Sequence, residues 1–120
     1  MHVNEVKFFD VIPIDSYGPG FFRVEGKVLK SAIVCSGSGV FLWKGYEDFG
    51  CFENLRNKID VVFIGTGNEI YQIPEFFRTR IEKMGLALEI MSTPSACRTY
   101  NVLLSEGRRI AIAALPVEGR

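Results

Sequence analysis

The chain has 120 residues, 48% of them hydrophobic, and its 14 basic and 14 acidic residues give a formal net charge of zero. This length suits one domain around a single core and excludes two domains. Because the two charge signs are interspersed rather than blocked, neither nucleic acid nor an anionic membrane is expected as the main partner.

The first half of the chain predicts a β-hairpin extension. Residues 1–14 are expected to fray, and the Tyr-Gly-Pro-Gly stretch at residues 17–20 can only be loop. Three β-favouring runs predict strands: Phe21–Glu25, Lys27–Cys35 and Val40–Trp43. Gly26 supplies the tight turn between the first two strands, and the Ser-Gly-Ser-Gly stretch at residues 36–39 supplies a flexible connection to the third.

The second half of the chain alternates helices with strands. Phe49, Phe52 and Leu55 recur at helical spacing and predict a short helix. Three largely apolar runs predict buried strands: Ile59–Ile64, Leu86–Met91 and Arg109–Leu115.

Two further helices are predicted between these strands. Pro74 suits the first position of one helix, and Gly85 ends it. Its buried stripe consists of apolar residues at helical spacing, namely Phe77, Ile81 and Met84. Thr93 is expected as the N-cap of the other helix, which Gly107 ends. The resulting order predicts an α/β domain with a βαβαβ C-terminal half and right-handed crossovers, whose sheet the N-terminal hairpin extends or covers.

The cysteines and the hydropathy pattern indicate a cytoplasmic protein. The three cysteines, Cys35, Cys51 and Cys97, are odd in number and widely spaced, which predicts reduced thiols in a reducing compartment. No apolar run approaches the roughly 18 residues that span a bilayer, and residues 1–15 lack a signal-peptide core. Membrane insertion is therefore not expected.

The residue types that usually carry catalysis are scarce in this chain. The single histidine, His2, lies in the segment that is expected to fray, so no catalytic base is predicted. One histidine and three scattered cysteines give no metal-ligand cluster. We therefore predict a protein that is not an enzyme and that holds neither a metal nor a cofactor.

The loop Gly65-Thr66-Gly67 follows a predicted buried strand, where a dinucleotide-binding fold carries its phosphate loop. The third glycine is missing and about seven residues separate the loop from the next helix, so the dinucleotide fingerprint fails. A tight exit from the sheet, made possible because glycine reaches positive φ, is the favoured interpretation.

The start of the last helix is the best candidate for a ligand site. Its free amides and positive dipole end, with a basic side chain nearby, predict an anion-binding point, and the glycine loop completes a shallow cradle. The residues of this predicted site are Thr93, Ser95, Ala96, Cys97, Arg98, Gly65, Thr66 and Gly67. In the alternative interpretation Thr93 and Ser95 cap the helix, Cys97 is a small buried hydrophobic residue and Asn101 bonds to backbone.

Aromatic residues provide the second kind of candidate site. Tyr17 and Trp43 are candidate anchors for a protein partner, because aromatic side chains supply much of the contact energy at interfaces. A contiguous apolar patch on the surface would mark such an interface.

A longer motif resembles a known family. Residues 93–101 read Thr-Pro-Ser-Ala-Cys-Arg-Thr-Tyr-Asn, and residues 106–108 read Glu-Gly-Arg. Together with Tyr17-Gly18-Pro19-Gly20, Trp43, Gly65-Thr66-Gly67 and Met91, they resemble the domain-of-unknown-function family 498, also called Mth938-like. The resemblance runs from about Tyr17 to Pro116 and implies a three-layer α/β fold with a mixed central sheet.

The resemblance also implies a type of partner. Its members include a mitochondrial complex I assembly factor of the third type and an adipogenesis-associated protein, whereas prokaryotic members have no agreed activity. A protein partner is therefore expected, such as an assembly intermediate of a respiratory complex, and a homodimer is a further expectation. We predict a non-catalytic protein-binding or complex-assembly helper; the alternative is a small-molecule or anion-binding protein with weak thiol chemistry at Cys97.

Overall fold

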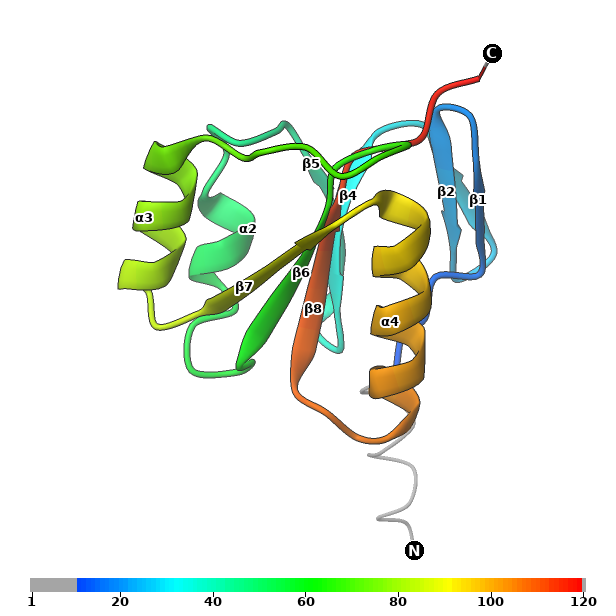
Figure 1. The fold of residues 1–120 in the computed structure, drawn as a ribbon. Coiled ribbons are helices and arrows are strands. Elements are labelled where there is room, and N and C mark those ends of the chain that lie inside the picture. The colour runs from blue at the N-terminus through cyan, green and yellow to red at the C-terminus, as the bar shows by residue number, and fades with distance from the viewer. Residues whose placement is uncertain (1–10, 120) are drawn as a thin grey trace, which may run out of the picture.

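The computed structural model describes residues 11–119, and Figure 1 shows their arrangement. Within these residues a central sheet has helices on both faces, and a smaller sheet lies beside it. The strands are β1 (Ser16–Gly18), β2 (Phe21–Val24), β3 (Lys27–Leu29), β4 (Ala32–Ser36), β5 (Gly39–Trp43), β6 (Val61–Gly65), β7 (Ala87–Met91) and β8 (Ile110–Ala114). The helices are α2 (Gly50–Glu53), α3 (Glu75–Lys83) and α4 (Thr93–Ser105).

The central sheet has five strands in the order β5-β4-β8-β6-β7 and is mixed. Strand β6 pairs in parallel with β7 and β8, whereas β4 is antiparallel to both β5 and β8. Every residue of β8 is buried, and β6 is buried after its first residue, because helices cover both faces of these central strands. The predicted α/β fold with a mixed sheet and a βαβαβ C-terminal half is therefore confirmed.

The hairpin region is more elaborate than the sequence predicted. Tyr17 and Gly18 belong to strand β1, which pairs with β2, so the expectation that residues 17–20 are only loop is wrong. The run Lys27–Cys35 is not one strand but two, because β3 pairs with β2 in the small sheet and β4 pairs with β8 in the central sheet. The predicted turn at Gly26 is present, and Glu25 and Gly26 have φ values of 53° and 78°, which suit a tight hairpin turn.

The two faces of the central sheet build two different cores. Alternate residues of a strand point to opposite faces, so in β4 Ile33 and Cys35 join one core and Val34 joins the other. The first core lies under α4 and the small sheet. The second core lies under α2 and α3 and is rich in aromatic rings, among them Phe52 and Phe77, whose centroids are 5.6 Å apart.

The start of the described chain, which is the end of the segment expected to fray, is held in place, and residues 1–10 lie outside the described residues. Asn101 accepts a hydrogen bond from the Ile14 amide and donates one to the Ile14 carbonyl, both at 2.9 Å. The Tyr100 hydroxyl donates to the Ile12 carbonyl at 2.8 Å. Two neighbouring residues of α4 therefore fix residues 12–14, while His2 lies outside the described residues.

Candidate functional site

The structure brings the two parts of the predicted anion site together at the carboxyl end of the parallel strands. The loop Gly65–Gly67 follows β6, and α4 begins directly after β7. The Gly67 amide donates to Thr93 Oγ1 at 2.9 Å, and the Thr93 amide donates to the Gly67 carbonyl at 2.8 Å. The connections after β6 and β7 lead to helices on opposite faces, which is where open α/β sheets usually leave a crevice for a ligand.

Thr93 fills this crevice from inside the protein. Its side chain is fully buried, and its hydroxyl accepts from Gly67 and donates to the Leu115 carbonyl at 2.6 Å. A Cβ on Gly65 would lie 2.8 Å from Thr93 Oγ1 and 3.2 Å from the Ala114 Cβ, so only glycine fits there. Thr93 therefore fills the inside of the crevice, and a hollow of about 1080 Å³ lies outside it, with Gly20, Gly67 and Glu118 among its lining residues.

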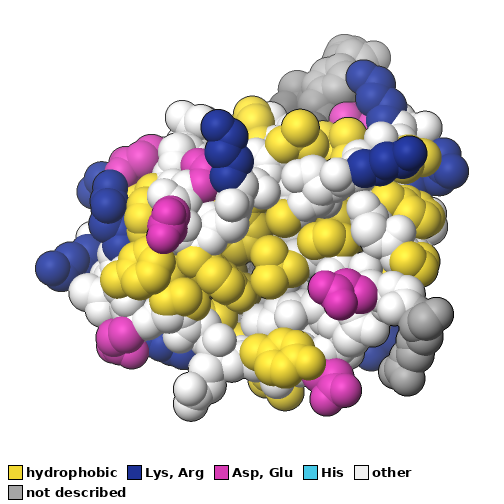
Figure 2. Space-filling model, turned by 90° about the horizontal axis from the view of Figure 1, so that it is seen from above, with side chains coloured by type: hydrophobic (Ala, Val, Ile, Leu, Met, Phe, Trp, Pro, Cys, Tyr) yellow, Lys and Arg dark blue, Asp and Glu magenta, His cyan; other side chains and the backbone are white. Residues whose placement is uncertain are grey.

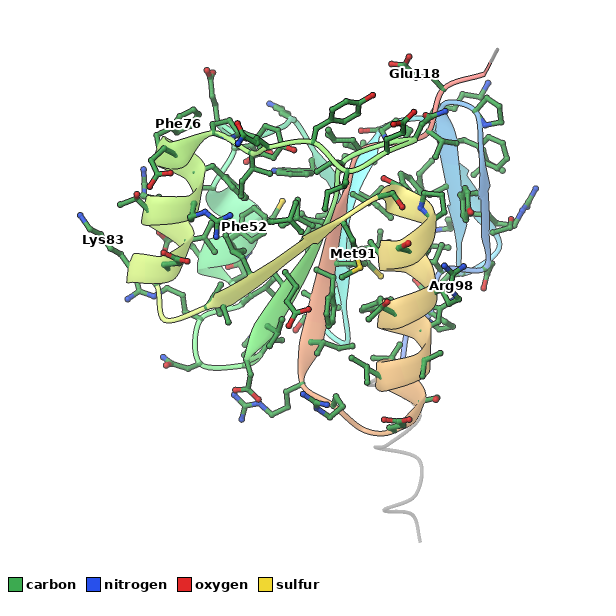
Figure 3. The ribbon with its side chains drawn as sticks, in the orientation of Figure 1. Phe52, Phe76, Lys83, Met91, Arg98 and Glu118 are labelled. Atoms are coloured by element: carbon green, nitrogen blue, oxygen red, sulfur yellow. The ribbon has the colours of Figure 1, made fainter. Side chains whose placement is uncertain are left out.

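The first turn of α4 is capped by Ser92, not by Thr93 as the sequence predicted. The Ser92 hydroxyl accepts from the Ser95 amide at 3.4 Å, and the Ser92 carbonyl accepts from the Ala96 amide at 2.8 Å. Pro94 has no amide hydrogen, and the Thr93 amide is already bonded to Gly67. These bonds favour the capping alternative that the sequence left open. Figure 3 shows Arg98 at the side of α4.

Thr66 organises the loop that follows β6. Its hydroxyl donates to the Glu69 carbonyl at 2.6 Å and accepts from the Tyr71 amide at 3.0 Å. Its own amide donates to the Met91 carbonyl at 2.9 Å, which ties the loop to β7. Thr66 is 5% exposed and its hydroxyl positions backbone, although the residue also lines the hollow at this end.

The thiols near α4 are unsuited to nucleophilic chemistry. Burial raises the pKa of Cys97 from 9.0 to about 12 and that of Cys35 from 9.0 to about 11. Burial also raises the pKa of Tyr100, whose hydroxyl lies 3.6 Å from the Cys35 sulfur. Because the thiolate is the reactive form, the geometry argues against the thiol chemistry that the sequence suggested at Cys97.

One of the two predicted aromatic anchors is in the core. Trp43 is only 2% exposed, its ring lies 5.8 Å from that of Phe52, and its indole nitrogen donates to the Asp48 carbonyl at 3.1 Å. The prediction that Trp43 anchors a partner is wrong, because the ring faces the second core. Tyr17 is exposed on the edge strand β1 and stays a candidate.

An apolar surface at the carboxyl end comes mainly from residues that the sequence analysis did not name as a candidate site. Ile70, Tyr71 and Phe76 are 64%, 59% and 51% exposed, and Phe49 and Ile73 beside them are half-buried. We call these five residues the carboxyl-end patch. Figure 2 looks down on this end and shows a connected hydrophobic area above α2 and α3.

A signal for this patch was present in the sequence. Phe76 falls outside the buried stripe of its helix, so an aromatic ring had to be exposed there. Ile70 and Tyr71 lie between a predicted strand and a predicted helix, where large apolar side chains are uncommon.

Residues 11–119 contain neither a membrane-spanning helix nor a cluster of metal ligands. No helix in this part of the chain is long and apolar enough to cross a membrane. Nor do any three of the His, Cys, Asp and Glu side chains described there gather as metal ligands would.

A family model and two relatives by sequence place the chain in the same family. The model of the family "Protein of unknown function (DUF498/DUF598)" matches residues 14–115. The chain is 40% identical to an uncharacterized protein of Rhodobacter capsulatus, over 99% of this chain and 96% of that protein. It is 30% identical to the NADH dehydrogenase (ubiquinone) 1 alpha subcomplex assembly factor 3 of Rattus norvegicus, over 94% of this chain but only 65% of that protein.

Solved structures agree with this assignment. A protein from Bartonella henselae, described as an outer membrane protein, superposes with a TM-score of 0.81 at 35% identity, covering 91% of this chain and 98% of that one. A Mth938-like domain from Bordetella pertussis superposes with a TM-score of 0.71 at 23% identity, covering 97% and 91%. The predicted family resemblance and the Mth938-like fold are confirmed.

Proposed function

We propose that this chain, which belongs to the DUF498/DUF598 family of proteins of unknown function, is a non-catalytic protein-binding module that helps a multisubunit complex to assemble. The rat relative is an assembly factor for NADH dehydrogenase, and the chain spans 65% of its length. We extend the proposal to the same class of partner, an assembly intermediate of a respiratory NADH dehydrogenase.

The carboxyl-end patch is the observation that carries this proposal. Ile70, Tyr71 and Phe76 expose more than half of their surface, and they lie within seven residues of the chain. Grouped apolar side chains of this size are typical of interaction sites, whereas scattered ones are not. Burying them against a partner would remove apolar surface from water, which is the main favourable term in protein association.

The patch is held rigidly, which favours binding. The bonds of Thr66 to Glu69 and Tyr71 fix the loop that carries Ile70 and Tyr71. Phe76 is held by α3, whose next residue, Phe77, is fully buried in the second core. A surface whose backbone is already ordered loses little conformational entropy when a partner binds.

The patch has aromatic support and charged neighbours of both signs. Phe49 lies between Phe76 and the core, with its centroid 6.5 Å from that of Phe76, and the Arg80 guanidinium lies 4.3 Å from the Phe49 ring centroid. Glu69 and Glu75 adjoin Ile70 and Phe76 in the chain and are exposed. The carboxylates favour basic groups at one part of the partner's margin, whereas Arg80 favours an acidic group beside Phe49.

Two observations support a non-catalytic role. Thr93 fills the inside of the crevice at the switch point of the sheet, and the hollow of about 1080 Å³ outside it has no histidine or cysteine among its described lining residues. The thiols of Cys35 and Cys97 are protonated at neutral pH, since burial raises the pKa of both.

A genetic experiment tests the proposed function. The gene would be deleted in the source organism, and the amount of assembled NADH dehydrogenase would be measured on native gels after complementation. We expect the wild-type chain to restore assembly and a variant with Ile70→Ser and Phe76→Ser to fail. A variant with Val28→Ser and Val102→Ser is the matched control, because these residues are 44% and 50% exposed elsewhere. Full restoration by the patch variant would contradict the proposal.

Self-association is the competing use of the same patch. A monomer should have a mass of 13.5 kDa in light scattering, and a homodimer should have twice that mass. We propose that the chain is monomeric without its partner, so a dimer that the Ile70→Ser and Phe76→Ser variant dissociates would reassign the patch.

The predicted cytoplasmic location is also part of the proposal. The three cysteines are free, and two of them are buried with raised pKa values, as suits a reducing compartment. Cell fractionation followed by immunoblotting would test this location, and recovery with the membrane or periplasmic fraction would overturn it.

A further inference from the structure

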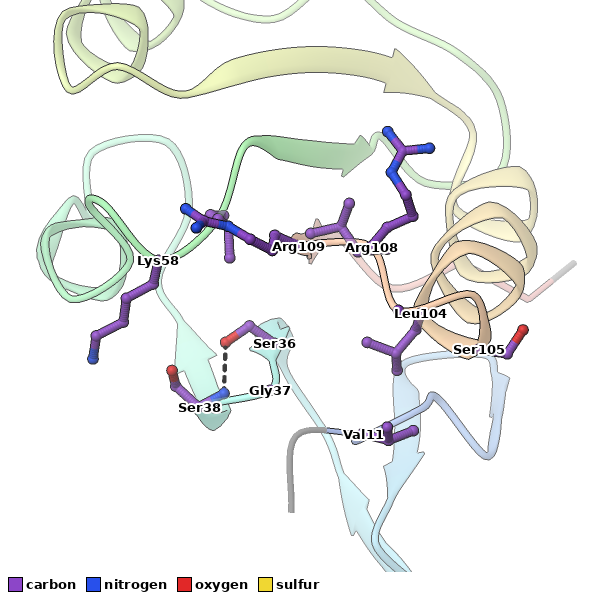
Figure 4. A pocket seen from close by; sticks show the side chains of 12 residues that line it. Val11, Ser36, Gly37, Ser38, Lys58, Leu104, Ser105, Arg108 and Arg109 are labelled. Carbon is purple, nitrogen blue, oxygen red and sulfur yellow. Dashed lines mark hydrogen bonds between the residues drawn. The ribbon is translucent and has the colours of Figure 1, made fainter. Parts of the chain in front are cut away.

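A cavity lies at the opposite end of the central sheet, where β6 and β8 begin. Its volume is about 590 Å³, and Figure 4 shows the segments around it. The turn after β4 and Leu104 of α4 face each other across the space, and Lys58 and Arg109 lie along its remaining side. Cavities of about 300–1,000 Å³ are the usual size for small-molecule sites.

The inner wall of the cavity is apolar. Ile59, Leu104 and Ile110 line it and are each less than one-tenth exposed. A bound molecule would therefore bury an apolar part against these side chains. A simple inorganic ion would leave this wall unused.

The charged lining has one sign. Lys58, Arg108 and Arg109 line the cavity, and no acidic side chain does so among residues 11–119. The whole chain has a formal net charge of zero, so this local excess of positive charge is a property of the site. It favours a ligand with a negative group.

The end of α4 sets the position of the two arginines. The amides of Gly107 and Arg108 donate to the Leu104 and Leu103 carbonyls at 3.0 Å and 3.1 Å, and Gly107 has a φ of 81°. This C-cap satisfies helix carbonyls that would otherwise repel an anion. The exposed guanidinium of Arg108 points away from the cavity in Figure 4, so rotation about its side-chain bonds must bring it to a ligand.

Arg109 and Ser36 hold defined positions at the cavity. The Arg109 guanidinium donates to the Asn57 carbonyl at 3.1 Å and lies 3.6 Å from the exposed carboxylate of Asp60. Such an exposed ion pair is weak and leaves other donors of the guanidinium available. Ser36 is 1% exposed, and its oxygen accepts from the Ser38 amide at 3.0 Å, which leaves its hydroxyl proton to donate.

We propose that this cavity binds an organic anion with a carboxylate head and an apolar body. The head would be bound by the Ser36 hydroxyl together with Lys58 and Arg108, whose charged ends point away from Leu104 in Figure 4 and must turn inward. The body would lie against Leu104 and Ile110. The proposal does not depend on the proposed assembly function, because the carboxyl-end patch lies at the other end of the sheet. It places anion binding at the end of α4 rather than at its start.

Nuclear magnetic resonance titration of the labelled full chain tests the proposal, with octanoate as the probe. We expect saturable shifts at the amides of Ser36–Ser38 and Leu104–Ile110. Acetate should bind at least about tenfold more weakly because it lacks the apolar body. The neutral alcohol 1-octanol should also bind about tenfold more weakly because it lacks the charge.

Paired substitutions test whether Lys58 and Arg108 supply the positive charges that bind the carboxylate. Lys58→Gln with Arg108→Gln should weaken octanoate binding about tenfold. Arg78→Gln with Lys83→Gln on α3 makes the same change in net charge away from the cavity and should leave the affinity unchanged. Equal weakening by both pairs, equal binding of 1-octanol, or no saturable shift at the cavity amides would overturn the proposal.

Discussion

The two ends of the parallel strands differ in the charge of the residues that line them. At the carboxyl end, the hydroxyls of Thr66 and Thr93 bind the chain's own backbone, and the surface above is apolar with acidic neighbours. At the amino end, a cavity of about 590 Å³ remains between the strands and the end of α4, lined by basic side chains. Both ends therefore hold a hollow, but only the one at the amino end has basic side chains among its described lining residues.

The family motif at the start of α4 shapes the carboxyl end from inside the protein. Thr93 fills the inside of the crevice, whereas Tyr100 and Asn101 attach residues 12–14 to the helix. In the sequence these residues suggested a ligand site, but in the structure their polar groups form hydrogen bonds within the protein. The motif therefore specifies how the chain is assembled around α4.

The largest expected effect concerns Gly65, which tests how tightly the carboxyl end is packed. Gly65→Ala should lower the free energy of unfolding by about 4 kcal/mol, because the new Cβ displaces the Thr93 hydroxyl and strains the close contact. Gly50→Ala is the control, since its Cβ would meet nothing closer than 3.7 Å in α2. Urea denaturation measures the stability of both variants. An unfolding midpoint that Gly65→Ala leaves unchanged would show that the carboxyl end is loosely packed.

Alkaline pH tests α4, the helix that joins the two ends. The folded-state pKa values of Cys35 and Cys97 are raised above 9.0, so their stabilising contribution is complete below pH 9 and is lost as pH rises through about 11 and 12. Between pH 8 and pH 10 the free energy of unfolding should fall by about 3 kcal/mol.

The matched protein for this pH experiment carries Cys35→Ala and Cys97→Ala. It should be less stable at pH 8 but should lose much less of its remaining stability by pH 10 when urea denaturation is repeated. The same pH dependence in both proteins would contradict the assignment of the effect to the thiols.

Removing the Thr93 hydroxyl alone should have an intermediate effect. Thr93→Val keeps the shape but leaves the Gly67 amide and the Leu115 carbonyl buried without this partner, which should cost about 2 kcal/mol. Thr79→Val on the exposed side of α3 should change stability by less than about 0.5 kcal/mol. Calorimetry would compare the stability of the two variants. Equal losses of stability would show that the Thr93 hydroxyl does not stabilise the carboxyl end.

The smallest effect on stability is expected at the two proposed binding surfaces. Ile70→Ser with Phe76→Ser, and Lys58→Gln with Arg108→Gln, should each change the free energy of unfolding by less than about 0.5 kcal/mol per residue. Their side chains are exposed and contribute little to either core. A thermal melt checks this, and a large loss would mean that the surface residues are structural.

The order of the elements followed from the sequence, because it depends on local patterns. The apolar runs of β6 and β8, the buried stripe of α3 and the glycines that end α3 and α4 were all predicted within a residue or two. Hydrophobic periodicity and turn residues act over a few neighbouring residues, so both can be read directly from the sequence.

Long-range pairing decided the features that the sequence did not reveal. Only the tertiary structure divides residues 27–35 between two sheets, buries Trp43 and brings Thr93 to Gly67, 26 residues away in the chain. The cavity likewise combines the turn after β4 with the end of α4. Local propensity determined where each helix and strand forms, but the neighbours that each strand acquires determined which polar groups are bonded internally and where space remains.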